Sequence, residues 1–135
     1  MSATLTALLG FLAWTLFLLV LMEGIRSRLV LSRKVPANGF TPDNAGLSPF
    51  MQRLARAHAN CLEGLPLFGG YLVLAAVAGK TGVTDPLAYV LLAARIVQSL
   101  IHLASVSPVA VTARFSAFAV QMGIAIYWTF ALFGA

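Results

Sequence analysis

The chain has 135 residues, of which 60% are hydrophobic and 10% charged, with a net charge of +5. A soluble domain of this length cannot enclose so much apolar surface, so the composition favours a membrane protein and excludes an ordinary soluble enzyme. The apolar runs are continuous, without the alternation of a barrel strand, which favours an all-α bundle. Most basic residues lie at the ends of apolar runs, as membrane anchors do, so we expect no nucleic-acid partner.

Proline, glycine and charged residues divide the chain into four apolar segments. The segments predict four membrane-spanning helices within a single domain, residues 1–135: 5–31, 48–78, 85–105 and 107–133. The last three each begin with a capping residue followed by proline, at Ser48-Pro49, Asp85-Pro86 and Ser107-Pro108. The first has no basic start and no evident cleavage site, so we interpret it as a retained helix and not a signal peptide.

The basic residues also predict an orientation. Arg26, Arg28, Arg33 and Lys34 surround the end of the first helix, and loops rich in lysine and arginine stay in the cytoplasm. Four spans then leave both termini on the non-cytoplasmic side. We expect a multi-pass protein of a bacterial inner membrane.

The second helix carries a polar stripe through its apolar surroundings. Arg53, Arg56, Asn60 and Glu63 fall within about a quarter of a helical turn, whereas His58 points elsewhere. Polar groups inside a bilayer are unfavourable unless something faces them. The stripe therefore predicts a polar partner or a ligand.

Pro66, three residues after Glu63, removes a backbone hydrogen bond, which predicts a kink in the second helix.

The third and fourth helices supply candidate partners for this stripe. Arg95, Gln98 and His102 share one face of the third helix, and Arg114 lies near the start of the fourth. At about 1.5 Å per residue, Glu63 and Arg95 reach similar depths near the middle of the membrane. Because either charge alone is unfavourable there, we predict a buried ion pair between these two side chains.

One motif resembles a known family. The pattern Arg53-x-x-Arg56-Ala57-His58-x-Asn60-x-x-Glu63-x-x-Pro66, followed by Ala94-Arg95-Ile96-Val97 and an arginine early in the fourth helix, is similar to the MAPEG family, the membrane-associated proteins in eicosanoid and glutathione metabolism. The resemblance implies four-helix subunits that form homotrimers and bind glutathione between neighbours near the cytoplasmic side. It implies glutathione transferase or glutathione-dependent peroxidase activity, or eicosanoid synthesis.

The resemblance also implies roles for individual residues. Arg114 would stabilise the glutathione thiolate, which attacks a lipophilic electrophile or a lipid hydroperoxide, with glutathione as co-substrate and no metal. Structural roles fall to Glu63, Arg95, Pro66 and His58. The expected glutathione-binding residues are Arg53, Arg56, Asn60, Glu63, Arg95, Gln98 and His102.

Three positions depart from better-known members of the family. His102 replaces a tyrosine, Ala59 an arginine and Phe115 a serine, which removes hydrogen-bond donors.

Two other classes of protein remain open at this point. One is a small proton-coupled multidrug transporter, which favours an acidic pore, whereas the embedded charges here are mostly basic. The other is a non-catalytic membrane scaffold of the same fold.

Overall fold

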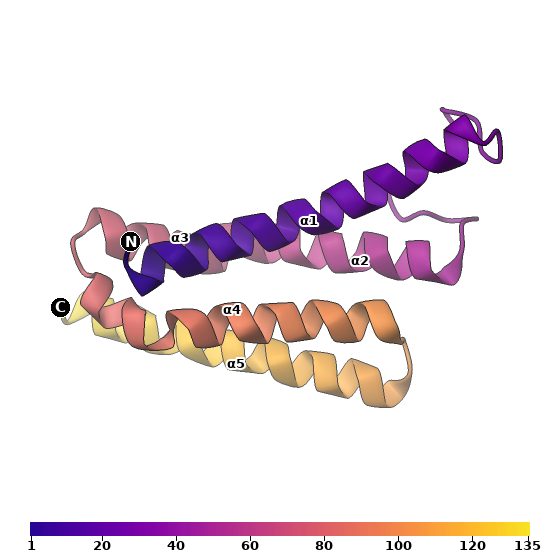
Figure 1. Ribbon diagram of the computed structural model, residues 1–135. Helices are drawn as coiled ribbons and strands as arrows, with labels where there is room; N and C mark the ends of the chain where they lie inside the picture. The colour runs from indigo at the N-terminus through magenta and orange to yellow at the C-terminus, as the bar shows by residue number, and fades with distance from the viewer.

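A computed structural model describes all 135 residues and is all-helical, as the sequence predicts (Figure 1). A short π-helical turn, η1, joins two of its α-helices into one continuous helical rod. The elements are α1 (Ala3–Leu31), α2 (Pro49–Gly64), η1 (Leu65–Gly69), α3 (Gly70–Val77), α4 (Thr81–Ala104) and α5 (Pro108–Phe133). Because α2, η1 and α3 continue one another, there are four rods. Each is long and apolar enough to cross a membrane.

The central helix of the bundle is α4, which packs against α1, α2, α3 and α5. By contrast, α5 packs almost entirely on α4, with a small contact to α3. Both chain termini lie at the same end as the α3–α4 turn, which we call the terminal end (Figure 1). The opposite end, the loop end, carries the 32–48 loop and the α4–α5 turn, and there α1 diverges from the other helices.

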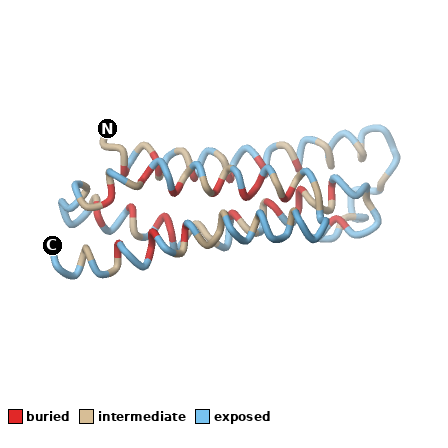
Figure 2. Tube along the Cα trace, turned by 90° about the horizontal axis from the view of Figure 1, so that it is seen from below, coloured by how far each residue is buried: buried red, intermediate tan, exposed pale blue.

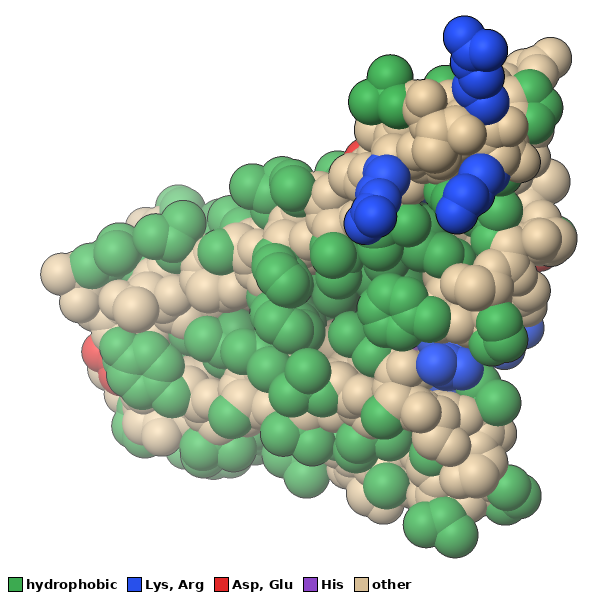
Figure 3. Space-filling model, turned by 45° about the vertical axis from the view of Figure 1, so that its right-hand side comes forward, with side chains coloured by type: hydrophobic (Ala, Val, Ile, Leu, Met, Phe, Trp, Pro, Cys, Tyr) green, Lys and Arg blue, Asp and Glu red, His purple; other side chains and the backbone are tan.

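Two apolar clusters hold the rods together. One surrounds Phe11, Phe68 and Trp128 towards the terminal end, and the other surrounds Leu18 and Leu54 towards the loop end. Only 27 of the 135 residues are buried, mostly along the facing sides of the rods (Figure 2). Apolar side chains cover much of the outside (Figure 3), which suits contact with lipid or with another subunit.

Two of the three predicted helix starts are confirmed. The Ser48 hydroxyl accepts a hydrogen bond from the N–H of Met51, and the Ser107 hydroxyl accepts one from Ala110. Both serines precede a proline in the first helical position. This arrangement satisfies a free N–H at a point where proline lacks one.

The third predicted start is wrong, because α4 begins at Thr81 and not at Asp85. Asp85 instead caps a different helix: its Oδ1 accepts from the N–H of Thr4 (2.8 Å) and from the Thr4 hydroxyl (2.6 Å) at the start of α1. A carboxylate is favourable at a helix N-terminus. Pro86 stays inside the helix, at its sixth residue, where it lacks the N–H for one i→i−4 hydrogen bond.

The irregularity predicted at Pro66 takes the form of η1. The proline lies in this π-helical turn, between the polar half of the second rod and its apolar half. Proline has no N–H to complete the regular helical pattern, and a wider turn is a common accommodation. All the charged residues of this rod precede the turn, in α2, and the last of them, Glu63, lies next to it near the middle of the rod.

Candidate functional site

A pocket of about 400 Å³ lies at the loop end between α2, the end of α4 and the start of α5. Four of its lining residues are polar: Arg56 and Asn60 from α2, His102 from α4 and Arg114 from α5. Ala59, Val106 and Val111 complete the wall. The structure therefore brings together four of the residues predicted from the sequence, from three separate helices.

Local helix geometry explains how these side chains meet. Arg56 and Asn60 are four residues apart on α2 and so lie on the same face, one turn above the other. His102 lies in the last turn of α4, and the short connection to α5 brings Arg114 back within two turns of that helix's start. Ser107 caps α5 and so determines where the helix that carries Arg114 begins.

His102 is the polar group fixed most firmly in the pocket. Its side chain is buried, and its Nδ1 lies 3.3 Å from Nδ2 of Asn60. An amide NH₂ group can only donate, so Nδ1 of His102 accepts. A neutral His102 ring then carries its proton on Nε2, which makes Nε2 a hydrogen-bond donor.

The pocket is electrostatically positive. Neither Arg56 nor Arg114 forms an ion pair, and no carboxylate lines the wall. Arg56 is exposed and Arg114 is half-buried, so both guanidinium groups can reach a bound molecule. Arginine is the side chain best suited to carboxylates, because its fork of N–H groups matches two oxygens. The pocket can thus hold a small anion and stabilise a negative charge next to an apolar wall.

Arg95 lies deeper, inside the bundle, and does not line this pocket. Its Nη1 donates to the backbone carbonyl of Asn60 (3.3 Å), whereas Nε and Nη2 have no hydrogen-bond partner. Three aromatic rings surround the guanidinium carbon at 5.4 to 5.9 Å, those of Phe11, Phe68 and Phe118. These cation–π contacts hold the charge in place without a counter-ion.

The predicted ion pair between Glu63 and Arg95 is therefore not formed within the chain. Glu63 is exposed on the outer face of α2, and the chain's one ion pair joins Arg26 to Glu23. The prediction rests on the similar depth of the two residues, and depth does not determine the direction in which a side chain points around its helix. Arg95 points into the bundle and Glu63 away from it.

Three other predicted residues also lie outside the pocket. Arg53 donates from Nε to the carbonyl of Leu103 (2.7 Å) and so ties α2 to α4. Gln98 is buried and accepts from Nε2 of Gln121 (2.8 Å), which joins α4 to α5. His58 is half-buried and does not line the pocket. In this chain, Arg53 and Gln98 hold together the helices that form the pocket.

The sequence did not identify several residues that support the pocket or surround Arg95. Gln121 is a polar residue in an apolar helix, and that signal could have identified it as a partner of another helix. The three phenylalanines around Arg95 cannot be told from ordinary core residues in the sequence. Cys61 is buried beside Ser99, with its sulfur 3.2 Å from the hydroxyl. Small and apolar wall residues such as Val111 carry no signal in a chain this hydrophobic.

Four spanning helices with a basic pocket at one end of the bundle define an integral membrane protein with a positively charged site. The sequence model of the MAPEG family matches residues 4–134, and the chain therefore belongs to that family. This result confirms the resemblance noted in the sequence. No curated protein and no solved structure matches the chain. Members of the family include glutathione transferases and glutathione-dependent peroxidases.

Proposed function

We propose that this protein is a glutathione-dependent membrane enzyme. It conjugates glutathione to lipophilic electrophiles, reduces lipid hydroperoxides, or does both. The observation that carries the proposal is the pocket in which Arg56, Asn60, His102 and Arg114 meet. Family membership supports glutathione as the co-substrate.

The pocket complements the charges of glutathione, which has two carboxylates, one ammonium and one thiol. Arg56, at the open side, binds a carboxylate. The Asn60 amide has a second N–H and a carbonyl oxygen for the peptide groups of glutathione, and Nε2 of His102 donates a further hydrogen bond. Glu63, although outside the pocket of a single chain, is a candidate for the ammonium group where two copies meet.

Arg114 is the residue that we assign to the chemistry. A thiol with a pKa near 8.5 is mostly protonated at neutral pH, and lowering that pKa by two units requires about 2.7 kcal/mol of differential stabilisation. A half-buried guanidinium without a competing carboxylate provides this kind of interaction. The thiolate then attacks an electrophile that arrives from the membrane along the apolar wall at Val106 and Val111. With a carbon electrophile, a carbon–sulfur bond forms as the leaving group departs with its electron pair. With a hydroperoxide, the O–O bond breaks as sulfur is oxidised, and a second glutathione supplies the remaining thiol of the disulfide product.

We also propose that the functional unit is a homotrimer with its loop end in the cytoplasm. Exposed apolar side chains on all the rods leave ample surface for subunit contacts. A carboxylate facing lipid is unfavourable by about 2.5 to 3.5 kcal/mol near mid-membrane, so an exposed Glu63 favours coverage by a neighbouring subunit. The concentration of arginine and lysine at the loop end supports its cytoplasmic placement.

Calorimetric titration of glutathione into the detergent-solubilised protein tests the proposal. We expect saturable binding, weakened about tenfold in Arg56→Gln because one charge-assisted contact of about 1.4 kcal/mol is lost. Lys80→Gln removes a basic residue in the α3–α4 turn, far from the pocket, and serves as the matched control. Absence of binding together with proton-driven cation efflux from vesicles would favour a transporter instead.

A further inference from the structure

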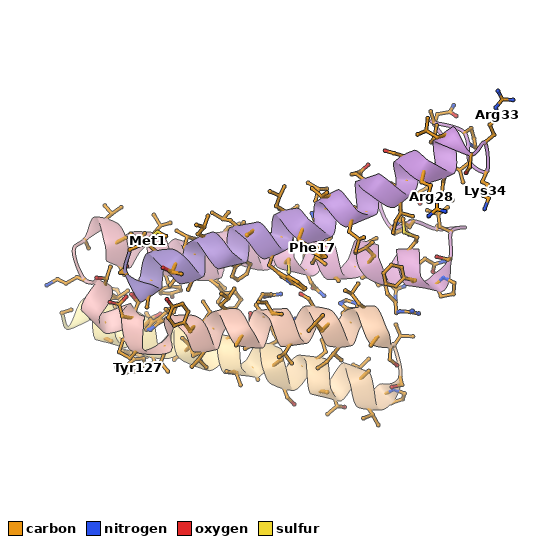
Figure 4. The ribbon with its side chains drawn as sticks, in the orientation of Figure 1. Met1, Phe17, Arg28, Arg33, Lys34 and Tyr127 are labelled. Atoms are coloured by element: carbon orange, nitrogen blue, oxygen red, sulfur yellow. The ribbon has the colours of Figure 1, made fainter.

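A second basic cluster lies outside the glutathione pocket. Arg28, Arg33 and Lys34, at the end of α1 and the start of the loop, are all exposed and form no ion pair. All three lie at the loop end, whereas Met1 and Tyr127 lie at the terminal end (Figure 4). Lysine and arginine side chains stand out from the surface in the same region (Figure 3).

The acidic side chains near this cluster are already engaged. Glu23 pairs with Arg26 at 3.0 Å, and Arg26 also donates from Nε to Asn44 (2.9 Å). In the loop, Asp43 accepts from the Thr41 hydroxyl (2.6 Å) and from the N–H of Ala45 (3.1 Å), and these bonds lower the pKa of the Asp43 carboxyl. The cluster therefore has a net positive charge that no group of the chain neutralises.

The backbone at the end of α1 places a basic residue where glycine is favoured. Arg33 donates its N–H to the carbonyl of Val30 (3.0 Å), and Lys34 donates to that of Leu29 (3.0 Å). These two bonds close the helix through a left-handed residue, a position usually occupied by glycine. Arg33, with φ of 60°, adopts that conformation despite its side chain. Fold stability alone does not explain an arginine here.

Apolar groups lie directly beside the cluster. Leu31 is 84% exposed, and a hollow of about 560 Å³ lies between the last turns of α1 and the loop. Val30, Leu31 and Phe40 form the apolar part of its wall, and the ion pair of Glu23 with Arg26 lies in the same wall. A phospholipid presents the matching combination, a charged phosphate next to an acyl chain. Inorganic phosphate would use only the charged part of this surface.

We propose that Arg28, Arg33 and Lys34 bind the phosphate of an anionic phospholipid whose acyl chain packs along Leu31 and the adjoining hollow. This inference does not depend on the glutathione reaction. Each basic side chain near an anionic headgroup strengthens association about fivefold, which is about 1 kcal/mol. The site thereby fixes the position of the diverging end of α1 at the membrane surface.

Native mass spectrometry of the protein in mixed micelles with equal amounts of phosphatidylglycerol and phosphatidylcholine tests this site. The wild-type protein should retain phosphatidylglycerol preferentially. Arg33→Gly should reduce the preference about fivefold while leaving the melting temperature unchanged or higher, because glycine suits the backbone there. The triple variant Arg28→Gln, Arg33→Gly, Lys34→Gln should retain both lipids equally.

Two controls test the location of the site and distinguish a lipid phosphate from free phosphate. Lys80→Gln, at the terminal end, should keep the wild-type preference, and excess inorganic phosphate should not displace the lipid. A triple variant that still prefers phosphatidylglycerol would overturn the proposal. So would displacement by inorganic phosphate, which would identify a site for free phosphate instead.

Discussion

Nδ2 of Asn60 donates to Nδ1 of His102 across the α2–α4 interface, and this bond determines which nitrogen of a neutral imidazole carries the proton. The histidine is thereby oriented as a donor towards the pocket and not as a base. His102 therefore still offers a donor where the resemblance gives a tyrosine, so this replacement does not remove a hydrogen-bond donor, contrary to the expectation from the sequence. Asn60 positions His102 as well as lining the pocket itself.

Nitrogen NMR of the two histidine rings tests this orientation. We expect His102 in the wild-type protein to be neutral with its proton on Nε2, and a mixture of tautomers in Asn60→Ala, because the fixed donor is gone. A His58→Asn variant assigns the signals, since the chain has only two histidines. A proton found on Nδ1 in the wild-type protein would contradict the hydrogen bond as described.

Arg114→Ala should abolish the ultraviolet absorbance of the thiolate that appears when glutathione is added. The loss of about 2.7 kcal/mol of stabilisation would return the thiol to a pKa near 8.5 and lower the thiolate fraction at neutral pH by more than tenfold. Arg114→Lys keeps the charge without the fork and should retain part of the signal. An unchanged signal in the alanine variant would remove Arg114 from the mechanism.

Gly64→Ala should destabilise the protein. A β-carbon at this position would lie 2.5 Å from Nη2 and 3.2 Å from Cζ of Arg95, whose guanidinium is enclosed by aromatic rings and has little room to move. Overpacking of this kind lowers the free energy of unfolding by about 1 to 3 kcal/mol. The measurement is thermal unfolding in detergent, followed by circular dichroism.

The matched control for this variant is Gly123→Ala, in the interior of α5. Nothing lies within 4 Å of the added carbon at Gly123, and alanine in a helix is favoured over glycine by about 0.5 to 1 kcal/mol. The control should leave the melting temperature unchanged or raise it. Equal effects of the two substitutions would show that Arg95 does not occupy the space beside Gly64.

Asp85→Ala should lower the stability of the terminal end by about 0.5 to 2 kcal/mol, the usual effect of losing a helix cap. The substitution removes the acceptor for both the N–H and the hydroxyl of Thr4, which joins the start of α1 to α4. Hydrogen exchange of the first turns of α1 should increase more than exchange at the loop end. Uniform exchange changes along the chain would argue against a local capping role.

The four-helix architecture was predictable because each span is a long apolar segment, and the mean hydropathy of such a segment does not depend on the position of any single residue. The stripe on α2 was also predictable in part, since helix periodicity places Arg56 and Asn60 on one face. Rotation about each helix axis was not predictable: the pair of Glu63 with Arg95 matched depth alone, and the structure shows Arg95 among phenylalanines. Side-chain direction depends on the contacts of all four rods at once.

The start of α4 illustrates a second limit. Asp85-Pro86 has the same local form as Ser48-Pro49 and Ser107-Pro108, and two of the three behave as helix starts. The exception arises because Asp85 finds Thr4, a residue 81 positions away in the chain. A local pattern carries no information about such a partner.

Arg56 and Arg114, which both line the pocket, belong to helices that pack on α4 and not substantially on one another. A change in the tilt of α5 alone would therefore alter the separation of Arg56 and Arg114 while leaving α1 and α2 undisturbed. The width of the opening is in this sense adjustable through a single helix, the one whose outer surface is most available to lipid or to an adjoining copy.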